Sequence, residues 1–373
     1  MNNLLDILNK SVNYLGKKNI KNARLTAESI ISEVMEMERI MLYAEFERIL
    51  SEDELKKIRE KLNDITNNDK KISDNNDFEN IKKSEKQLKL LLDKSISYLK
   101  KNNIDESKLI AEIVFSHVLN TDRMMLFTKY RDEIENEKIE KIRYFIQKIG
   151  REKFPVQYLL NEQEFYGRKF YVDKGVLIPR QDTEVLVEKL IEILKNKNLE
   201  KNSKIHPKIL DIGVGSGIIG ITAALEIKDS YVLGVDISEK ALETSEKNKE
   251  LLKVSNIKFL KSNLFENIEF KQFDMIVSNP PYISLNEAGI MSDDTLLHEP
   301  SEALFAENDG LYFYYEICQK ALDYLADFGY LLFEIGYKQG KNVAEIMTSS
   351  GFKNVEVIKD LAGLDRVVVG QKL

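Results

Sequence analysis

The sequence predicts an α/β protein in which two small all-helical domains precede a domain built on a mostly parallel sheet. From about residue 205, short β-branched runs alternate with helical segments, which is typical of a parallel sheet covered by helices on both faces. A glycine-rich turn follows the first of these runs. The front of the chain contains two similar stretches whose apolar residues recur every three or four positions, the period of a helix.

The two similar stretches are residues 1–66 and 87–150. Identical residues occur in both at a constant offset of 84 positions without gaps. They are Ser11, Tyr14, Leu15, Ile20, Leu25, Ala27, Glu28, Arg39 and Leu42, matched by Ser95, Tyr98, Leu99, Ile104, Leu109, Ala111, Glu112, Arg123 and Leu126. Each copy is expected to form a bundle of about four helices, and Ser51 followed by Glu54 predicts a capped helix start.

These patterns set the expected boundaries. We predict helical domains at 1–66 and 87–152, a flexible linker at 67–86, and a sheet domain at 153–373. The linker is expected to be mobile because it has almost no apolar residues to bury. Two interpretations of the extra module stay open, a duplicated partner-binding domain and a structural addition.

The sheet domain contains seven candidate strands, at 208–215, 231–238, 257–263, 274–279, 330–336, 355–360 and 365–371. In sheets of this kind, ligands bind beyond the carboxyl ends of the parallel strands. Residues that directly follow the strands are therefore the candidates for a binding site.

Composition and charge argue against several classes of function. A formal charge of −7 argues against a broad contact with nucleic-acid phosphates. Cys318 is the single cysteine, which excludes an intrachain disulfide and suits a reducing compartment. The three histidines, His117, His206 and His298, have no metal-ligand spacing, so no metal is expected. The chain shows no secretory signal and no long apolar run, and a cytoplasmic location is expected.

The glycine-rich turn DIGVGSG (211–217) follows the first strand. Glycines allow a tight turn and let a ligand approach the backbone. Asp236 ends the next strand, where its carboxylate could accept hydrogen bonds from ribose hydroxyls. The stretch GSGIIG (215–220) also fits the dinucleotide pattern G-x-G-x-x-G. The turn alone is therefore compatible with a nicotinamide or flavin cofactor as well as with S-adenosylmethionine.

A second motif favours one of these cofactors. The stretch DMIVSNPPYIS (274–284) ends an apolar strand in Asn279, Pro280, Pro281 and Tyr282. Prolines keep this segment extended and out of any helix. The oxygen of Asn279 and a proline carbonyl can accept two hydrogen bonds from one NH₂ group, and the ring of Tyr282 offers a stacking face. Because positioning can activate a nitrogen that is too weakly basic to react unaided, the motif favours methyl transfer to an amino group over hydride transfer.

About 220 carboxy-terminal residues resemble the release factor glutamine methyltransferases. The similar segments, in matching order and spacing, are 155–188, 209–217, 236–243, 277–283, 299–317, 334–340 and 360–370. The resemblance implies a Rossmann-like class I methyltransferase domain that uses S-adenosylmethionine and releases S-adenosylhomocysteine. It also implies methylation of N5 of the glutamine in the Gly-Gly-Gln loop of bacterial-type class I peptide chain release factors.

The resemblance further implies roles for individual residues. The expected cofactor-binding residues are Asp211, Gly213, Val214, Gly215, Ser216, Gly217, Asp236, Ile237, Asn263, Leu264 and Asn279. The expected substrate-binding residues are Asn279, Pro280, Pro281 and Tyr282, of which Asn279, Pro280 and Tyr282 are the expected catalytic residues. A β-hairpin is expected at 164–172, where Phe165 and Phe170 are expected either to wall the substrate pocket or to pack the hairpin.

Arg180 is equally compatible with a structural and a functional role. Glu299, Pro300 and Glu334 are expected to support the fold rather than to act as catalysts.

The chain departs from the family pattern at three places. Asn263 and Leu264 stand where the family usually has Asp and Trp, and Gln181 stands for the usual Pro. An Asn oxygen can still accept a hydrogen bond from an adenine amine, so affinity is expected to suffer more than specificity. The third departure is the second helical domain, which leaves the mode of partner docking open.

Two further functions stay open at this point. A nucleic-acid amino-methyltransferase would flip a base into the same Asn-Pro-Pro-Tyr clamp. A non-catalytic interaction protein would use the tandem helical modules for binding and the sheet domain to sense a cofactor.

Overall fold

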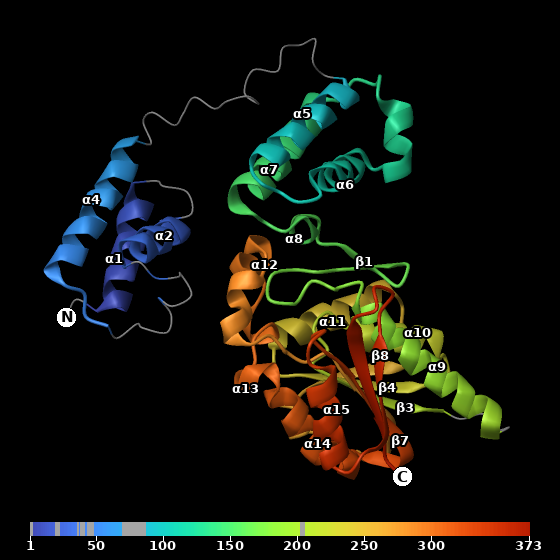
Figure 1. Cartoon of the computed structure of the whole chain (residues 1–373). Helices are drawn as coiled ribbons and strands as arrows, with labels where there is room; N and C mark the ends of the chain where they lie inside the picture. The colour runs from blue at the N-terminus through green and yellow to red at the C-terminus, as the bar shows by residue number, and fades with distance from the viewer. Residues whose placement is uncertain are drawn as a thin grey trace. The chain divides into compact units, whose positions relative to one another are not determined.

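The computed structural model describes residues 3–18, 23–35, 37, 42, 48–68, 87–201 and 206–373. The chain divides into two compact units, Met1–Glu152 and Lys153–Leu373 (Figure 1). The predicted linker at 67–86 lies outside the described residues from position 69 onward, as do Ile20 and Arg39 of the repeat. Within the described ranges, no helix is long and apolar enough to cross a membrane.

Both copies of the repeat are helical, as predicted. The first contains α1 (Leu4–Lys17), α2 (Ala23–Met35) and α4 (Glu52–Asn68). The second contains α5 (Leu88–Lys101), α6 (Ser107–Leu119), the 3₁₀ helix η2 (Arg123–Lys129) and α7 (Asn136–Glu152). Adding 84 to the bounds of α1, α2 and α4 gives the bounds of α5, α6 and α7, so the offset read from identities also holds for the helices.

The repeat extends to the contacts that hold each bundle together. The backbone nitrogen of Leu4 donates to the Arg48 carbonyl, and Leu88 donates to the Asp132 carbonyl, 84 positions later. In the first copy, apolar residues of the three helices form one buried cluster that includes Leu42. Each copy thus buries the apolar face that its helical period predicted.

The sheet of the second unit has seven strands in the order β5-β4-β3-β6-β7-β9-β8. The strands are β3 (Lys208–Ile212), β4 (Tyr231–Asp236), β5 (Ile257–Lys261), β6 (Phe273–Ser278), β7 (Leu325–Glu334), β8 (Lys353–Lys359) and β9 (Asp365–Gln371). Pairings among β3, β4, β5, β6 and β7 are parallel, and β9 runs antiparallel to both β7 and β8. This is the predicted mostly parallel sheet. The chain lays down its strands in one direction from β3 to β5 and in the other direction from β6 onward, so the strand order reverses between β3 and β6, where a ligand crevice is expected.

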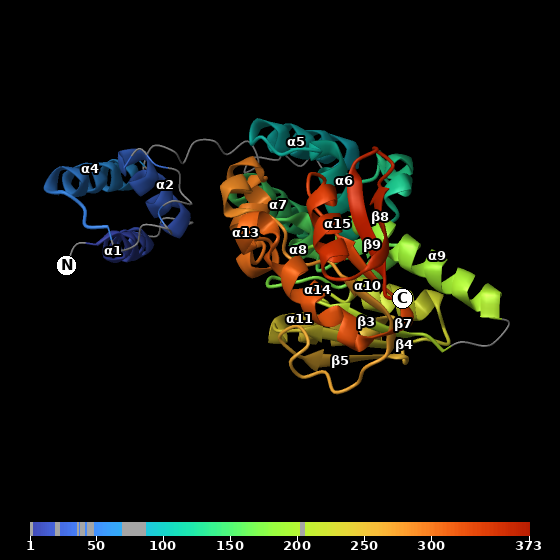
Figure 2. The same cartoon turned by 60° about the horizontal axis from the view of Figure 1, so that its bottom comes forward.

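Helices cover both faces of the sheet (Figures 1 and 2). Helices α9 (Thr183–Lys201) and α10 (Ile218–Glu226) contribute to the buried cluster on one face. Helices α14 (Tyr312–Tyr324) and α15 (Gly340–Ser349) contribute to the cluster on the other face. Helix α11 (Glu239–Leu251) packs on β4 and β5. Because central strands are buried on both faces, β3 and β6 are almost continuously apolar.

The remaining elements are short. They are α8 (Val156–Leu160), the hairpin strands β1 (Gln163–Phe165) and β2 (Arg168–Phe170), η3 (Leu285–Ile290), α12 (Asp293–His298), η4 (Ser301–Ala303) and α13 (Glu307–Gly310). The hairpin lies within the predicted range apart from its first residue.

Several strand bounds differ from the sequence-based expectation. The strand expected at 208–215 ends at Ile212, because the next residue, Gly213, has a φ of +77° and turns the chain out of the sheet. The strand expected at 231–238 likewise ends at Asp236. Strand β7 instead begins at Leu325, five residues before the expected start. The residues after these early ends form the loops of the candidate site.

Candidate active site

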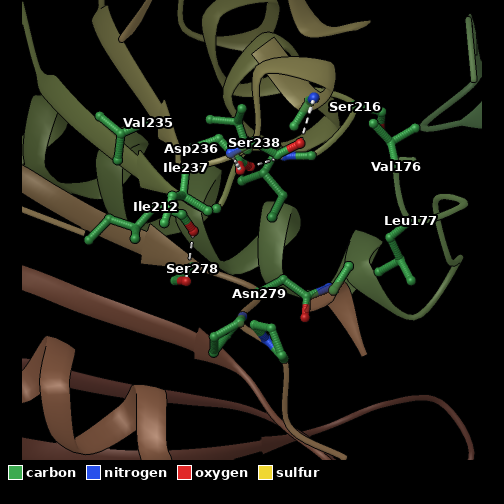
Figure 3. Close-up of a pocket in the computed structure, with 18 of the residues that line it drawn as sticks. Val176, Leu177, Ile212, Ser216, Val235, Asp236, Ile237, Ser238, Ser278 and Asn279 are labelled. Carbon is green, nitrogen blue, oxygen red and sulfur yellow. Dashed lines mark hydrogen bonds between the residues drawn. The ribbon is translucent and has the colours of Figure 1, made fainter. Parts of the chain in front are cut away.

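A pocket opens at the carboxyl ends of β3, β4 and β6, the position that the topology predicts. It encloses about 1130 Å³ when the space open to solvent is counted. Figure 3 shows Asp236 and Asn279 on different sides of the pocket, with Val176 and Leu177 on a third side. Of the predicted site residues, those that line it are Gly213, Val214, Gly215, Ser216, Asp236, Ile237, Asn263, Leu264, Asn279, Pro280 and Pro281.

The glycine-rich turn forms an open cradle. Gly213 and Gly215 have φ values of +77° and +53°, and a Cβ built on either would meet no atom of the described residues within 4 Å. The described part of the chain therefore leaves room beside the backbone here, and only glycine adopts this backbone shape without strain. A side chain at either position would fill room that a ligand could use. This geometry fits a cofactor that lies against the backbone.

Asp236 connects the end of β4 to this turn. Its Oδ2 accepts a hydrogen bond from the backbone nitrogen of Gly215 at 3.0 Å, and its Oδ1 accepts one from Ser238 at 2.9 Å. Burial raises the pKa of the carboxyl, while the backbone hydrogen bonds act in the opposite direction. Each carboxylate oxygen has a second lone pair, so both can also accept from hydroxyl groups in the pocket.

Two predicted cofactor-binding residues support the turn from beneath and do not line the pocket. Asp211 is 0% exposed, and its Oδ2 accepts a hydrogen bond from the Gly220 nitrogen at 2.8 Å. Burial raises the pKa of its carboxyl to about 7. Gly217 caps the start of α10, where an added Cβ would lie 2.8 Å from Ile221. Both residues shape the turn from within the fold.

The loop after β5 contributes Asn263 and Leu264 to the pocket. Nδ2 of Asn263 donates to Oε1 of Glu266 at 2.9 Å. Because this hydrogen bond uses the nitrogen of the Asn263 side chain, its oxygen is free to accept from the adenine amine of a cofactor, the role expected for this position.

The segment after β6 brings Asn279, Pro280 and Pro281 to the pocket. The hydroxyl of Ser278 donates to the Ile212 carbonyl at 2.8 Å and so joins the ends of β6 and β3. Nδ2 of Asn279 donates to Oγ1 of Thr183 at 3.3 Å. The motif therefore lies across from the glycine-rich turn, as expected.

Tyr282 lies beside the pocket, not in its lining. Its ring packs against the core cluster on the α14 face, and its carbonyl accepts from Nε2 of Gln339 at 3.0 Å. Burial raises the pKa of its hydroxyl, and the nearby Glu334 acts in the same direction. The expected stacking role of Tyr282 stays a prediction.

Phe165 and Phe170 lie away from the pocket lining. Both are at most 1% exposed, and their rings meet edge to face at a centroid distance of 6.1 Å. They belong to the core cluster beneath α9 and α10. This position favours hairpin packing over a pocket wall, because a fully buried ring has no surface left for a substrate.

Sequence reasoning missed a third wall of the pocket. It consists of Gly175, Val176, Leu177, Pro179 and Thr183 together with Pro300, Glu302, Ala303 and Phe313. Both stretches lie in the segments that resemble the family, but no periodicity in them indicates that they fold over the ends of the strands. Their position at the pocket depends on a contact between the two stretches, which the sequence does not reveal.

That contact is an ion pair between a buried carboxylate and a partly exposed guanidinium. Oε1 of Glu299 accepts from the guanidinium of Arg180 at 2.6 Å, and Oε2 accepts from the Ile178 nitrogen at 2.9 Å. The Glu299 side chain is 1% exposed and that of Arg180 is 40% exposed. Glu299 therefore supports the fold, as expected, while Arg180 both pairs with it and lines the pocket.

Comparisons with known proteins agree with this geometry. The PrmC N-terminal domain matches residues 6–67 and 91–160, and the methyltransferase small domain matches 183–310. A release factor glutamine methyltransferase of Fusobacterium nucleatum is 41% identical over 348 residues, which cover 92% of this chain and 94% of the relative. The chain belongs to the release factor glutamine methyltransferase family. The family uses S-adenosylmethionine, and the open turn and the Asp236 carboxylate are suited to binding a cofactor of this kind.

Two further comparisons cover a smaller share of this chain. A release factor glutamine methyltransferase of Clostridium botulinum is 40% identical over 290 residues, 76% of this chain and 99% of the relative. A solved protein-(glutamine-N5) methyltransferase (release factor-specific) from Alicyclobacillus acidocaldarius is 29% identical and covers 54% of this chain and 99% of its own, with a TM-score of 0.33. The match of the PrmC N-terminal domain to two segments agrees with the duplicated helical module of this methyltransferase.

Proposed function

We propose that this methyltransferase transfers a methyl group to N5 of the glutamine in the Gly-Gly-Gln motif of class I peptide chain release factors. The observation that carries the proposal is the position of Asn279 and Pro280 in the pocket, across from the glycine-rich turn. Family membership supports the same reaction.

The chemistry follows from what the residues can bind. S-adenosylmethionine supplies an electrophilic methyl group and is converted into S-adenosylhomocysteine. The Asn279 oxygen and the Pro280 carbonyl are acceptors that can hold the two N–H groups of a glutamine amide and so fix the direction of its nitrogen lone pair. An amide nitrogen is a weak nucleophile because its lone pair is delocalised. Positioning therefore has to supply most of the rate enhancement.

Proton release needs no dedicated base in this scheme. The nitrogen becomes acidic as it gains the methyl group, and its proton can then pass to water. Asn279 keeps an acceptor beside that nitrogen while its charge develops. The residues that line the cofactor side of the pocket, including Asp236, bind and orient the cofactor without taking part in the bond changes.

The proposal is tested by incubating the full chain with labelled S-adenosylmethionine and a class I release factor, either wild type or with Gln→Ala in its Gly-Gly-Gln motif. Labelling of the wild-type factor that disappears with the substitution is the expected result. Labelling that ignores the substitution would contradict the proposed target. Comparable labelling of DNA or ribosomal RNA would favour a nucleic-acid amino-methyltransferase instead.

A further inference from the structure

The nitrogen end of the Asn279 carboxamide is held by another element of the fold. Its Nδ2 donates to Oγ1 of Thr183 at 3.3 Å. Thr183 is the first residue of α9 and lines the pocket, although it is only 1% exposed. The start of α9 and the end of β6, which are far apart in the sequence, therefore meet at this amide.

A buried carboxyl group lies beside these two side chains. Glu334 ends β7, and the pairing of Phe333 with Ser278 makes Glu334 and Asn279 leave the sheet as neighbours. Glu334 is 1% exposed. Burial raises the pKa of its carboxyl to about 7, whereas hydrogen bonding from Thr183 and Asn279 acts in the opposite direction. Its Oε2 has no hydrogen-bond partner among the residues that the structure describes.

We infer that Thr183 and Glu334 orient the Asn279 carboxamide so that its oxygen faces the substrate amide. The inference rests on the proposed function and adds two positioning residues to it. An ionised carboxylate only accepts hydrogen bonds, whereas a hydroxyl both donates and accepts. Because the Thr183 hydroxyl donates to the Glu334 carboxyl, its oxygen is left to accept from Nδ2 of Asn279. The NH₂ end of the carboxamide therefore turns towards Thr183 and Glu334, which leaves Oδ1 on the side of the pocket.

Orientation matters because a carboxamide has nearly the same shape in both directions. Rotated by half a turn, Asn279 would present N–H donors to the N–H donors of the substrate amide. The substrate nitrogen would lose one of its two acceptors, and a buried donor would remain unpaired. Thr183 and Glu334 prevent that arrangement without having to touch the reacting atoms themselves.

The test compares two substitutions at Thr183. Thr183→Val keeps the size and β-branching of the side chain and removes the acceptor, while Thr183→Ser keeps the hydroxyl. At pH 8, above the raised pKa of Glu334, Thr183→Val is expected to lower kcat with the release factor by about tenfold. Thr183→Ser is expected to stay within about threefold of the wild type. The Kd of S-adenosylhomocysteine, measured by calorimetry, is expected to change by less than about twofold in both variants.

A matched control and a measurement without substrate separate positioning from loss of structure. Thr222 is a buried threonine on α10, outside the pocket lining, and Thr222→Val is expected to leave kcat unchanged. The measurement without substrate uses NMR of protein labelled with ¹⁵N at asparagine. The side-chain signal of Asn279 is identified as the one that disappears in Asn279→Ala. In Thr183→Val, the side-chain protons of Asn279 should exchange with solvent faster than in the wild type.

The inference would be overturned if Thr183→Ser lost as much kcat as Thr183→Val, or if the loss followed weaker cofactor binding. Unchanged exchange of the Asn279 side-chain protons in Thr183→Val would also overturn it. A wild-type protein that leaves release factors unmethylated would contradict the proposed function instead, and the exchange measurement would still decide whether Thr183 holds Asn279.

Discussion

Asn248 joins the glycine-rich turn to the chain that follows the hairpin, because its Nδ2 donates to the Ser216 carbonyl at 2.8 Å. The same side chain exchanges two hydrogen bonds with the backbone of Tyr171, at 2.6 Å and 2.9 Å. Asn248 is 0% exposed and lies outside the pocket lining. It therefore controls the shape of the cofactor cradle without reaching the cofactor.

Asn248→Ala is expected to weaken cofactor binding as well as stability. The substitution removes the hydrogen-bond partner of two carbonyls, those of Ser216 and Tyr171, and of the Tyr171 N–H. Because the Ser216 carbonyl is buried, the loss costs about 2 kcal/mol of folding free energy. Because the turn loses a support, the Kd of S-adenosylmethionine is expected to rise by about tenfold in calorimetry.

The matched control is Asn256→Ala. Asn256 also bridges backbone carbonyls, those of Ala224 and Ser230, but at a distance from the pocket lining. This variant is expected to lose stability in chemical denaturation while keeping its affinity for the cofactor. Equal losses of affinity in the two variants would show that Asn248 has no specific effect on the turn.

Arg180→Ala is expected to destabilise the fold through Glu299. The substitution leaves the Glu299 carboxylate, 1% exposed, without its guanidinium partner. The expected loss in chemical denaturation is about 2 kcal/mol, below that of a fully buried pair because Arg180 is 40% exposed. Adding Glu299→Gln should restore part of the loss, since it removes the unpaired charge. A double variant with the sum of both single losses would mean that the two side chains are not coupled.

Asn263→Asp alone is not expected to improve cofactor affinity, although Asp is the usual residue in the family. The new carboxylate would lie beside the carboxylate of Glu266, whose Oε1 accepts from Nδ2 of Asn263 at 2.9 Å. Like charges at this distance repel. Combining Asn263→Asp with Glu266→Gln should lower the Kd of S-adenosylmethionine by about threefold in calorimetry. Tighter binding of S-adenosylmethionine by Asn263→Asp alone would show that Glu266 does not oppose a carboxylate at position 263.

The free energy of unfolding is expected to fall as the pH rises from about 4 to about 7, in part because of Asp211. Burial raises the pKa of its carboxyl from 3.8 to about 7. In this window the unfolded chain has already lost a proton that the folded protein still holds, so rising pH favours unfolding. Asp211→Asn removes this titration, and its free energy of unfolding should depend less steeply on pH. Parallel pH curves for wild type and variant would refute the assignment.

The sequence predicted the chemistry of the site better than its walls. The glycine-rich turn and the Asn-Pro-Pro-Tyr motif follow strands, and parallel strands bring their carboxyl ends to one edge, so Gly215 and Asn279 could be placed together in advance. The position of Asp211 beneath the turn could not be predicted, because which way a side chain near the end of a strand points depends on the packing of Gly220, whose nitrogen donates to its carboxylate. The wall that contains Thr183 was missed because it depends on the Arg180–Glu299 pair. These two residues are far apart in the sequence, and no sequence pattern indicates that they meet.

The most direct test of the account compares turnover and cofactor binding in Asn279→Ala. Asn279 is proposed to hold the substrate amide, so turnover with the release factor should fall by about a hundredfold or more. The Kd of S-adenosylmethionine in calorimetry should change by less than about threefold. An equal loss of turnover and cofactor affinity would contradict the central claim that Asn279 acts on the substrate.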